Sequence, residues 1–267
     1  MDLQLTGKRA IVTGGSRGIG KAIARELARE GVAVVIVARS EEVLKAAAAE
    51  LSAETGGKVT SIVCDTSNDE SVKGAVRDAI KALGGGVDIL VNCAATPSGQ
   101  AATPMLADVN DDNFWADMNV KVLGYLRTAR EVAPTMIAQG WGRIINISGL
   151  GARNAGAVLT SMRNASVASL TKNLADELGP KGINVTVVHP GLTRTEATPD
   201  VIKRRAQATG RSEADIELAM AEGNVVKKLI DAKDIAAVVT FLASPLSIAI
   251  TGDAIAAGGG APRSIYY

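Results

Sequence analysis

KRAIVTGGSRGIG, residues 8–20, joins a short apolar strand to a glycine-rich turn and then to a helix. The glycines of this turn allow a positive φ and leave no Cβ between the main chain and a bound pyrophosphate. Free N–H groups at the start of the following helix suit a phosphate. Strand, glycine turn, amphipathic helix and second strand in this order predict a dinucleotide site, whereas a structural turn without ligand is the weaker alternative.

The composition indicates one large α/β domain over residues 1–267. Hydrophobic residues make up 47% of the chain and aromatics only 3%, so Val, Ile, Leu and Ala must fill the interior. A net charge of +1 argues against nucleic-acid and membrane partners. Without a signal peptide or long apolar run, a cytoplasmic protein is expected. Cys64 and Cys93 are interpreted as small core residues, and no metal ligands are expected.

Strand and helix signals alternate along the chain, which predicts a Rossmann-type, doubly wound parallel sheet of about seven strands with helices on both faces. The expected strands are 10–12, 32–37, 59–63, 87–91, 143–147, 184–188 and 254–257. Long helices are expected at 111–139 and 159–178. The polar stretch 192–224 belongs to no expected strand, and such excursions beyond the carboxyl edge of a sheet usually cover the ligand.

Around these motifs the sequence resembles the short-chain dehydrogenase/reductase family, in particular its acyl-carrier-protein ketoreductase-like members. The likeness covers nearly the whole chain and includes the glycine turn, Asn119 in Met-Asn-Val, and Pro190-Gly191-Leu192-Thr193. It implies an oxidoreductase that binds a nicotinamide cofactor and acts on a small carbonyl or alcohol substrate. It also implies that Asp65 contacts the adenine and that Thr193 faces the nicotinamide amide.

The end of the second expected strand favours NADP(H) over NAD(H). An NAD-specific site places an acid there, which would repel a 2′-phosphate. Here Ala38 takes that position, and Arg39 could pair with or stack over the phosphate while Arg17 reaches it from the turn. Either arginine alone could equally be a surface charge. The expected cofactor-binding residues are Gly14, Ser16, Arg17, Gly18, Ile19, Gly20, Arg39, Ser40, Asp65, Thr66, Asn92, Ala94, Pro190, Gly191 and Thr193.

The resemblance breaks at the catalytic positions. Family members use a Tyr-x-x-x-Lys pair on the helix after the fifth strand and a serine just past that strand. A gapless match places Thr160 and Asn164 at the tyrosine and lysine positions, and Gly149 at the serine position beside Ser148. An aliphatic hydroxyl is too weak an acid to replace a phenol. The catalytic candidates are therefore Asn119, Ser148, Thr160 and Asn164.

Few other polar groups are candidates for the chemistry. His189, the only histidine, is interpreted as structural. Arg163 lies one turn after Thr160 and could be a pocket cation, although a surface-facing arginine is favoured. Tyr266 and Tyr267 are interpreted as interface aromatics, with reach into a neighbour's pocket as the alternative.

Two classes of function remain in play. One is an NADP(H)-binding oxidoreductase with an atypical mechanism and a degenerate active site. The other is a non-redox lyase, hydratase or isomerase, or a nucleotide-responsive binding protein, on the same fold. The helices 111–139 and 159–178 carry more apolar surface than one sheet contact can bury. Since relatives pair these helices, a homo-oligomer is expected, a tetramer or dimer.

Overall fold

A seven-stranded parallel sheet forms the centre of the fold, in a computed structural model that describes residues 1–96, 106–263 and 265. The strand order is β3-β2-β1-β4-β5-β6-β9, which is the doubly wound Rossmann-type arrangement that the sequence predicts. The strands are β1 (Arg9–Thr13), β2 (Ala33–Ala38), β3 (Val59–Val63), β4 (Ile89–Asn92), β5 (Gly142–Ile147), β6 (Ile183–Pro190) and β9 (Ala254–Ala257). The expected strands are confirmed, with ends that differ by at most two residues.

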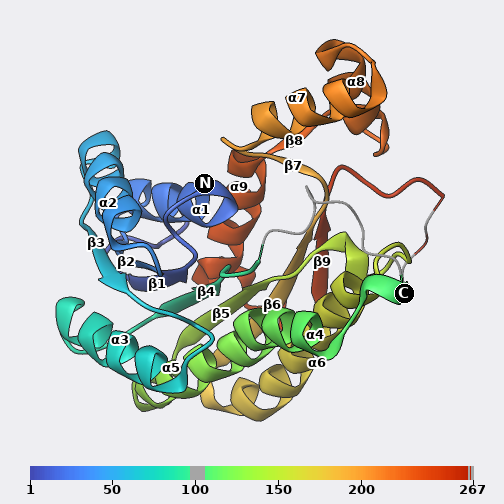
Figure 1. The fold of residues 1–267 in the computed structure, drawn as a ribbon. Coiled ribbons are helices and arrows are strands. Elements are labelled where there is room, and N and C mark those ends of the chain that lie inside the picture. The colour runs from blue at the N-terminus through green and yellow to red at the C-terminus, as the bar shows by residue number, and fades with distance from the viewer. Residues whose placement is uncertain (97–105, 264, 266–267) are drawn as a thin grey trace.

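Helices cover both faces of the sheet (Figure 1). One layer consists of α1 (Gly18–Arg29), α2 (Glu41–Thr55) and α9 (Ala232–Ala243), and the other of α3 (Asp69–Ala82), α5 (Gly124–Gln139) and α6 (Val158–Leu178). Successive strand residues alternate between the layers, so Val12 packs with the first and Ile11 with the second. Both faces are thus apolar, which explains the near-continuous hydrophobic runs of the strands.

The expected helix 111–139 is interrupted near its middle. It divides into α4 (Asp111–Met118), a π-helical turn over Asn119–Leu123, and α5. Periodicity did not reveal the interruption, because one wider turn leaves the helical pattern on either side intact. Such turns often occur at functional sites, because they change the direction of the side chains they carry.

The excursion after β6 contains a short strand, which the expectation of no strand in 192–224 missed. The two residues of β7 (Thr193–Arg194) pair in parallel with β8 (Ile230–Asp231). Two residues are too few to produce an alternating pattern in the sequence. The rest of the excursion forms α7 (Thr198–Thr209) and α8 (Glu213–Glu222), which stand away from the sheet (Figure 1). Across the described ranges, none of the helices has both the length and the apolarity to cross a membrane.

Candidate functional site

The glycine turn has the geometry of a dinucleotide cradle. Gly14 and Gly18 have φ of 68° and 58°, and a Cβ on Gly20 would lie 2.3 Å from the carbonyl oxygen of Gly14. The Thr13 hydroxyl oxygen accepts hydrogen bonds from the backbone N–H groups of Cys93 and Ala94, at 2.9 and 3.0 Å. The turn is therefore fixed to the end of β4, and side chains larger than glycine are excluded where a pyrophosphate would approach α1.

A carboxylate lies at the start of α1. Glu196, just after β7, accepts a hydrogen bond from the backbone N–H of Gly18 at 2.7 Å. Its neighbour Thr195 would be 3.7 Å from a Cβ on Gly18, so the first residues of the excursion lie across the glycine turn. The contact shows that the helix N-terminus attracts negative charge, as a phosphate site must.

The residues expected around the adenosine lie at the ends of β2 and β3. Arg39 and Ser40, after β2, and Arg17, in the glycine turn, are all exposed. Burial opposes ionisation of Asp65, but two hydrogen bonds from Ser67 and the charges of Arg39 and Arg127 together lower the pKa of Asp65. Asp65 is thus an ionised acceptor close to Arg39, which fits the adenine contact that the family resemblance implies.

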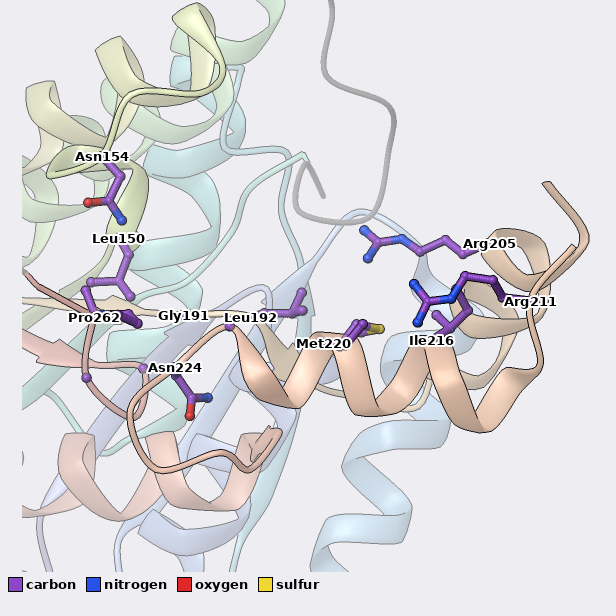
Figure 2. Close-up of a pocket in the computed structure, with 15 residues that line it drawn as sticks. Leu150, Asn154, Gly191, Leu192, Arg205, Arg211, Ile216, Met220, Asn224 and Pro262 are labelled. Carbon is purple, nitrogen blue, oxygen red and sulfur yellow. The ribbon is translucent and has the colours of Figure 1, made fainter. Parts of the chain in front are cut away.

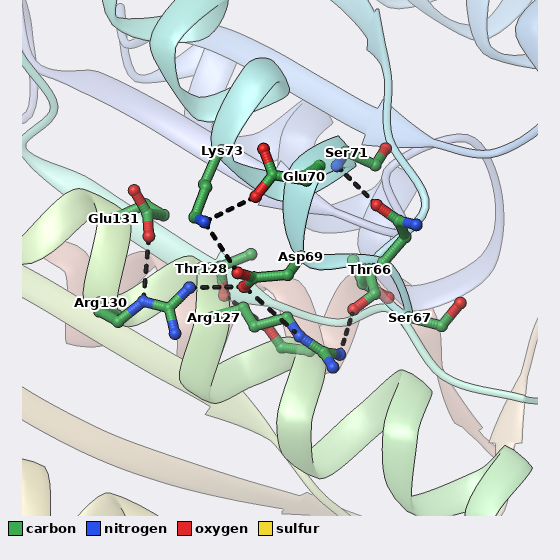
Figure 3. Close-up of polar contacts among 12 residues, drawn as sticks. Thr66, Ser67, Asp69, Glu70, Ser71, Lys73, Arg127, Thr128, Arg130 and Glu131 are labelled. Carbon is green, nitrogen blue, oxygen red and sulfur yellow. Dashed lines mark hydrogen bonds and ion pairs between the residues drawn. The ribbon is translucent and has the colours of Figure 1, made fainter.

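Two of the expected site residues have side chains committed elsewhere. Asn92 is fully buried, where its side-chain amide donates to Asn146 and accepts from the Thr128 hydroxyl. The Asn119 amide oxygen accepts from Arg127 at 2.8 Å. The same guanidinium nitrogen donates to the carbonyl oxygen of Thr66, at 3.1 Å, which ties the π-helical turn to the loop after β3 (Figure 3).

A cavity of about 510 Å³ lies next to the glycine turn, and Ile19, at the start of α1, is one of the residues that line it. Ser148, Gly149, Thr160 and Asn164 line it together, as do Pro190 and Gly191 from the end of β6. The structure thus brings three of the four catalytic candidates to one place, while Asn119 is not among the described lining residues. The Ser148 hydroxyl donates to the carbonyl oxygen of Asn164 at 3.0 Å, so its proton is already used.

The same cavity contains Lys121, which sequence reasoning missed. Lys121 is 3% exposed, and its ammonium donates to the carbonyl oxygen of Ser148 at 3.0 Å and to Asn164 Oδ1 at 3.1 Å. Burial and then the charge of Arg163 lower the pKa of Lys121 from 10.5 to about 7, against the opposing charge of Asp117. The only hint of this buried lysine in the sequence is its position among the apolar residues of Asn119–Leu123. Helical periodicity alone does not show that the Lys121 side chain points inward.

Comparisons with known proteins identify the family. A family model for short chain dehydrogenases matches residues 8–206. The chain belongs to the short-chain dehydrogenase/reductase family. Short-chain reductase protein NovJ of Streptomyces niveus is 35% identical over 254 residues, which cover 95% of this chain and 93% of NovJ. The 3-oxoacyl-(acyl-carrier-protein) reductase FabG of Aquifex aeolicus is 33% identical over 264 residues, covering 97% of this chain and 99% of FabG.

Solved structures agree with this assignment. L-sorbose reductase from Gluconobacter frateurii, complexed with NADPH and L-sorbose, superposes with a TM-score of 0.92 at 29% identity. The match covers 99% of this chain and 100% of that one. Solved neighbours include proteins with bound NADPH and one with bound NAD+. This chain therefore has the nucleotide-binding fold of the short-chain dehydrogenase/reductase oxidoreductases.

The structure corrects one expectation about this family member and bears on two others. Arg163, favoured as a surface residue, is 3% exposed at the cavity wall and forms an ion pair with Asp117, because α4 packs against α6 there. His189 is buried in β6, and burial lowers its pKa to about 4, so the ring is neutral at pH 7. Burial raises the pKa of Cys64 to about 11 and that of Cys93 to about 12, which leaves both as unreactive thiols. Tyr266 and Tyr267 lie outside the described residues.

Proposed function

We propose that this protein is an NADP(H)-dependent oxidoreductase of small carbonyl or alcohol substrates in which Lys121 supplies the proton. The observation that carries the proposal is the position of Lys121, buried in the cavity beside Asn164, with a pKa of about 7. Thr160 and Asn164 provide no acid of suitable strength. Lys121 lies in the π-helical turn between α4 and α5, and its ammonium lies next to Asn164, which carries no charge.

The arrangement around Lys121 suits proton transfer to a carbonyl oxygen. A nicotinamide dinucleotide held at the glycine turn would supply the hydride. An ammonium has three N–H donors, and two of those of Lys121 are directed to Ser148 and Asn164, which leaves one for a substrate in the cavity. A general acid works best when its pKa lies near the working pH, and that of Lys121 does. The neighbouring Arg163 adds positive charge that stabilises an oxygen gaining negative charge.

The pH dependence of turnover tests this role. Reduction needs protonated Lys121, so its rate should fall as the pH rises through about 7, whereas oxidation of the alcohol needs the neutral amine and should rise over the same range. Lys121→Met should lower turnover by roughly 10²–10⁴-fold and abolish this dependence. NADPH fluorescence titration of the variant checks that the fold and the cofactor site survive.

Lys172→Met is the matched control, since Lys172 lies on α6 but is exposed and paired with Asp176. It should keep both the rate and the pH profile. Brisk turnover by the Lys121→Met variant would overturn the proposed mechanism. NADPH binding without turnover of any ketone or aldehyde by the wild type would favour a nucleotide-responsive binding protein instead.

The proposed preference for NADP(H) rests on charge at the end of β2. Ala38 offers no carboxylate, and Arg39 and Arg17 are free to approach a 2′-phosphate because both are exposed. The NADPH in L-sorbose reductase supports this choice. Calorimetry should show tighter binding of NADPH than of NADH, and Arg39→Ala should narrow the margin by about tenfold, as expected for a charge-assisted hydrogen bond. Equal affinities in the wild type would contradict the preference.

The depressed pKa of Lys121 also favours a second candidate function, a lyase that works through a Schiff base. A neutral amine at pH 7 can attack a substrate carbonyl carbon, and loss of water then gives an iminium. Borohydride would reduce that iminium and leave a covalent adduct on Lys121, which peptide mass spectrometry detects. An adduct that forms without cofactor and disappears in Lys121→Met would support the lyase over the oxidoreductase.

A further inference from the structure

A second cavity, of about 620 Å³, adjoins the first. Four residues line both cavities: Leu150, Asn154, Gly191 and Leu192. From this shared wall the second cavity extends toward α7 and α8 (Figure 2). A substrate whose carbonyl group lies near Lys121 therefore has room to extend in one direction, along the excursion toward Arg205 and Arg211.

Two arginines stand at the outer end of the second cavity. The guanidinium groups of Arg205, from α7, and Arg211, from the α7–α8 connection, lie on the same side and face Met220 and Leu192 (Figure 2). Across residues 1–96 and 106–263, neither arginine forms an ion pair. Arg211 donates to the backbone carbonyl oxygen of Asp215 at 3.1 Å, while the nearby Glu217 pairs with Arg194. The outer end thus carries two positive charges that form no ion pair with any carboxylate of the described residues.

The rest of the wall is apolar except for two amides, the exposed Asn154 and the buried Asn224. Leu192, Ile216 and Met220 form the middle of the cavity and belong to one hydrophobic cluster. At the inner end, Asn224 is 8% exposed and donates to the carbonyl oxygen of Lys228 at 2.7 Å. Its side-chain oxygen has no hydrogen-bond partner within the described chain. That oxygen is itself buried, so it offers no acceptor to the cavity.

We infer that the second cavity binds the anionic end of an elongated substrate. A carboxylate or phosphate ester lies between Arg205 and Arg211, and the apolar body of the substrate packs on Leu192, Ile216 and Met220. Guanidinium groups suit both anions, because their paired N–H donors match two oxygens. The placement of the carbonyl group next to Lys121 rests on the proposed function, but anion binding in this cavity does not.

Calorimetry with three matched probes tests the anion site on the protein loaded with NADP+. The probes are 6-phenylhexanoate, 6-phenylhexyl phosphate and neutral 6-phenylhexanol. At least one anion should bind tenfold or more tightly than the alcohol, and its identity distinguishes a carboxylate from a phosphate ester. The Arg205→Met, Arg211→Met double variant should lose about tenfold in anion affinity, since a hydrogen bond to a charged group is worth at least that much. Its affinity for the alcohol should not change.

Arg204→Met is the control, because Arg204 is an exposed cation of α7 that does not line the cavity. Equal binding of the three probes, or the same loss from Arg204→Met as from the double variant, would overturn the inference. Lys121→Met separates this inference from the proposed function. That variant should keep anion binding while losing turnover, whereas a wild type that turns over ketones but does not distinguish the probes would refute only the anion site.

Discussion

Glu196 is a carboxylate that occupies the N-terminus of α1, where the phosphates of a dinucleotide are expected. Its bond to the Gly18 N–H is made from an exposed position on the excursion. Cofactor phosphates and this carboxylate carry the same sign of charge, so binding of the cofactor must release Glu196 from the turn. Release of the contact would also free the start of the excursion, which continues into α7 and the wall of the second cavity.

The Glu196→Gln variant should therefore bind NADPH more tightly than the wild type. A carboxylate near a helix N-terminus contributes about 0.3–1 kcal/mol, which corresponds to roughly a two- to fivefold gain in affinity. Calorimetry at low ionic strength measures this gain, and added salt should reduce it. Glu213→Gln, at the exposed start of α8, is the control and should leave the affinity unchanged. Weaker binding by Glu196→Gln would instead make Glu196 a cofactor ligand.

At the scale of elements, two local features shape the cavity that contains Lys121. The π-helical turn between α4 and α5 carries Lys121 inward, and Arg127 and the Thr66 hydroxyl satisfy carbonyl groups of Asn119 and Val120. The loop Leu150–Ala152 packs on the start of α6, so a Cβ on Gly149 would lie 2.9 Å from Asn164 Nδ2. A serine at position 149 and the present Asn164 rotamer are therefore incompatible, which links the two substitutions in this chain.

Restoring the family's catalytic groups should consequently require a fourth change. The triple variant would combine Gly149→Ser, Thr160→Tyr and Asn164→Lys. Because the Lys121 ammonium lies 3.1 Å from the Asn164 side chain and 3.0 Å from the carbonyl oxygen of Ser148, the new lysine would place a second ammonium next to it. Like charges in a buried site repel, so the triple variant should gain little reductase activity. Adding Lys121→Met should raise turnover of an activated ketone with NADPH at least tenfold over the triple variant. Equal turnover by the triple and quadruple variants would show that the ammonium of Lys121 does not interfere with the lysine introduced at position 164.

At the scale of the whole molecule, the layer of α5 and α6 leaves apolar side chains uncovered. Leu126 and Ile137 are spaced three helical turns apart on α5, and each is 39% exposed. Met162 on α6 and Trp115 on α4 are 47% and 60% exposed. Large apolar side chains gathered on neighbouring helices are typical of a subunit interface. This layer is the face on which a homo-oligomer is expected to assemble.

Light scattering at micromolar concentration should thus find a tetramer or a dimer. The Leu126→Glu, Met162→Glu double variant should shift it toward the monomer, because charges would be buried without partners in the interface. Val43→Glu is the control, since Val43 is also exposed but lies on α2 in the opposite layer. A monomeric wild type would contradict the expectation, as would an equal shift from Val43→Glu.

The sequence by itself determined the sheet, its order of strands and helices, and the glycine turn. These features are local, because alternation of apolar runs, glycines at required backbone angles and helical periodicity are each written within about twenty neighbouring residues. They predicted the nucleotide site, and the resemblance to the short-chain dehydrogenase/reductase family implied that Ser148, Thr160 and Asn164 lie together. The same resemblance predicts that Thr160 and Asn164 occupy the usual tyrosine and lysine positions.

Only the tertiary structure decided which side chains meet around these positions. Lys121 meets Asn164 across 43 residues, Arg163 meets Asp117 across 46, and Glu196 meets Gly18 across 178. Whether a lysine or arginine is buried depends on elements that pack together from distant parts of the chain, and no local pattern records that. The lowered pKa of Lys121 and the positions of Arg205 and Arg211 at one cavity follow from the same long-range packing. For this reason the fold could be predicted from the sequence, whereas the burial of Lys121 and the meeting of Arg205 with Arg211 could not.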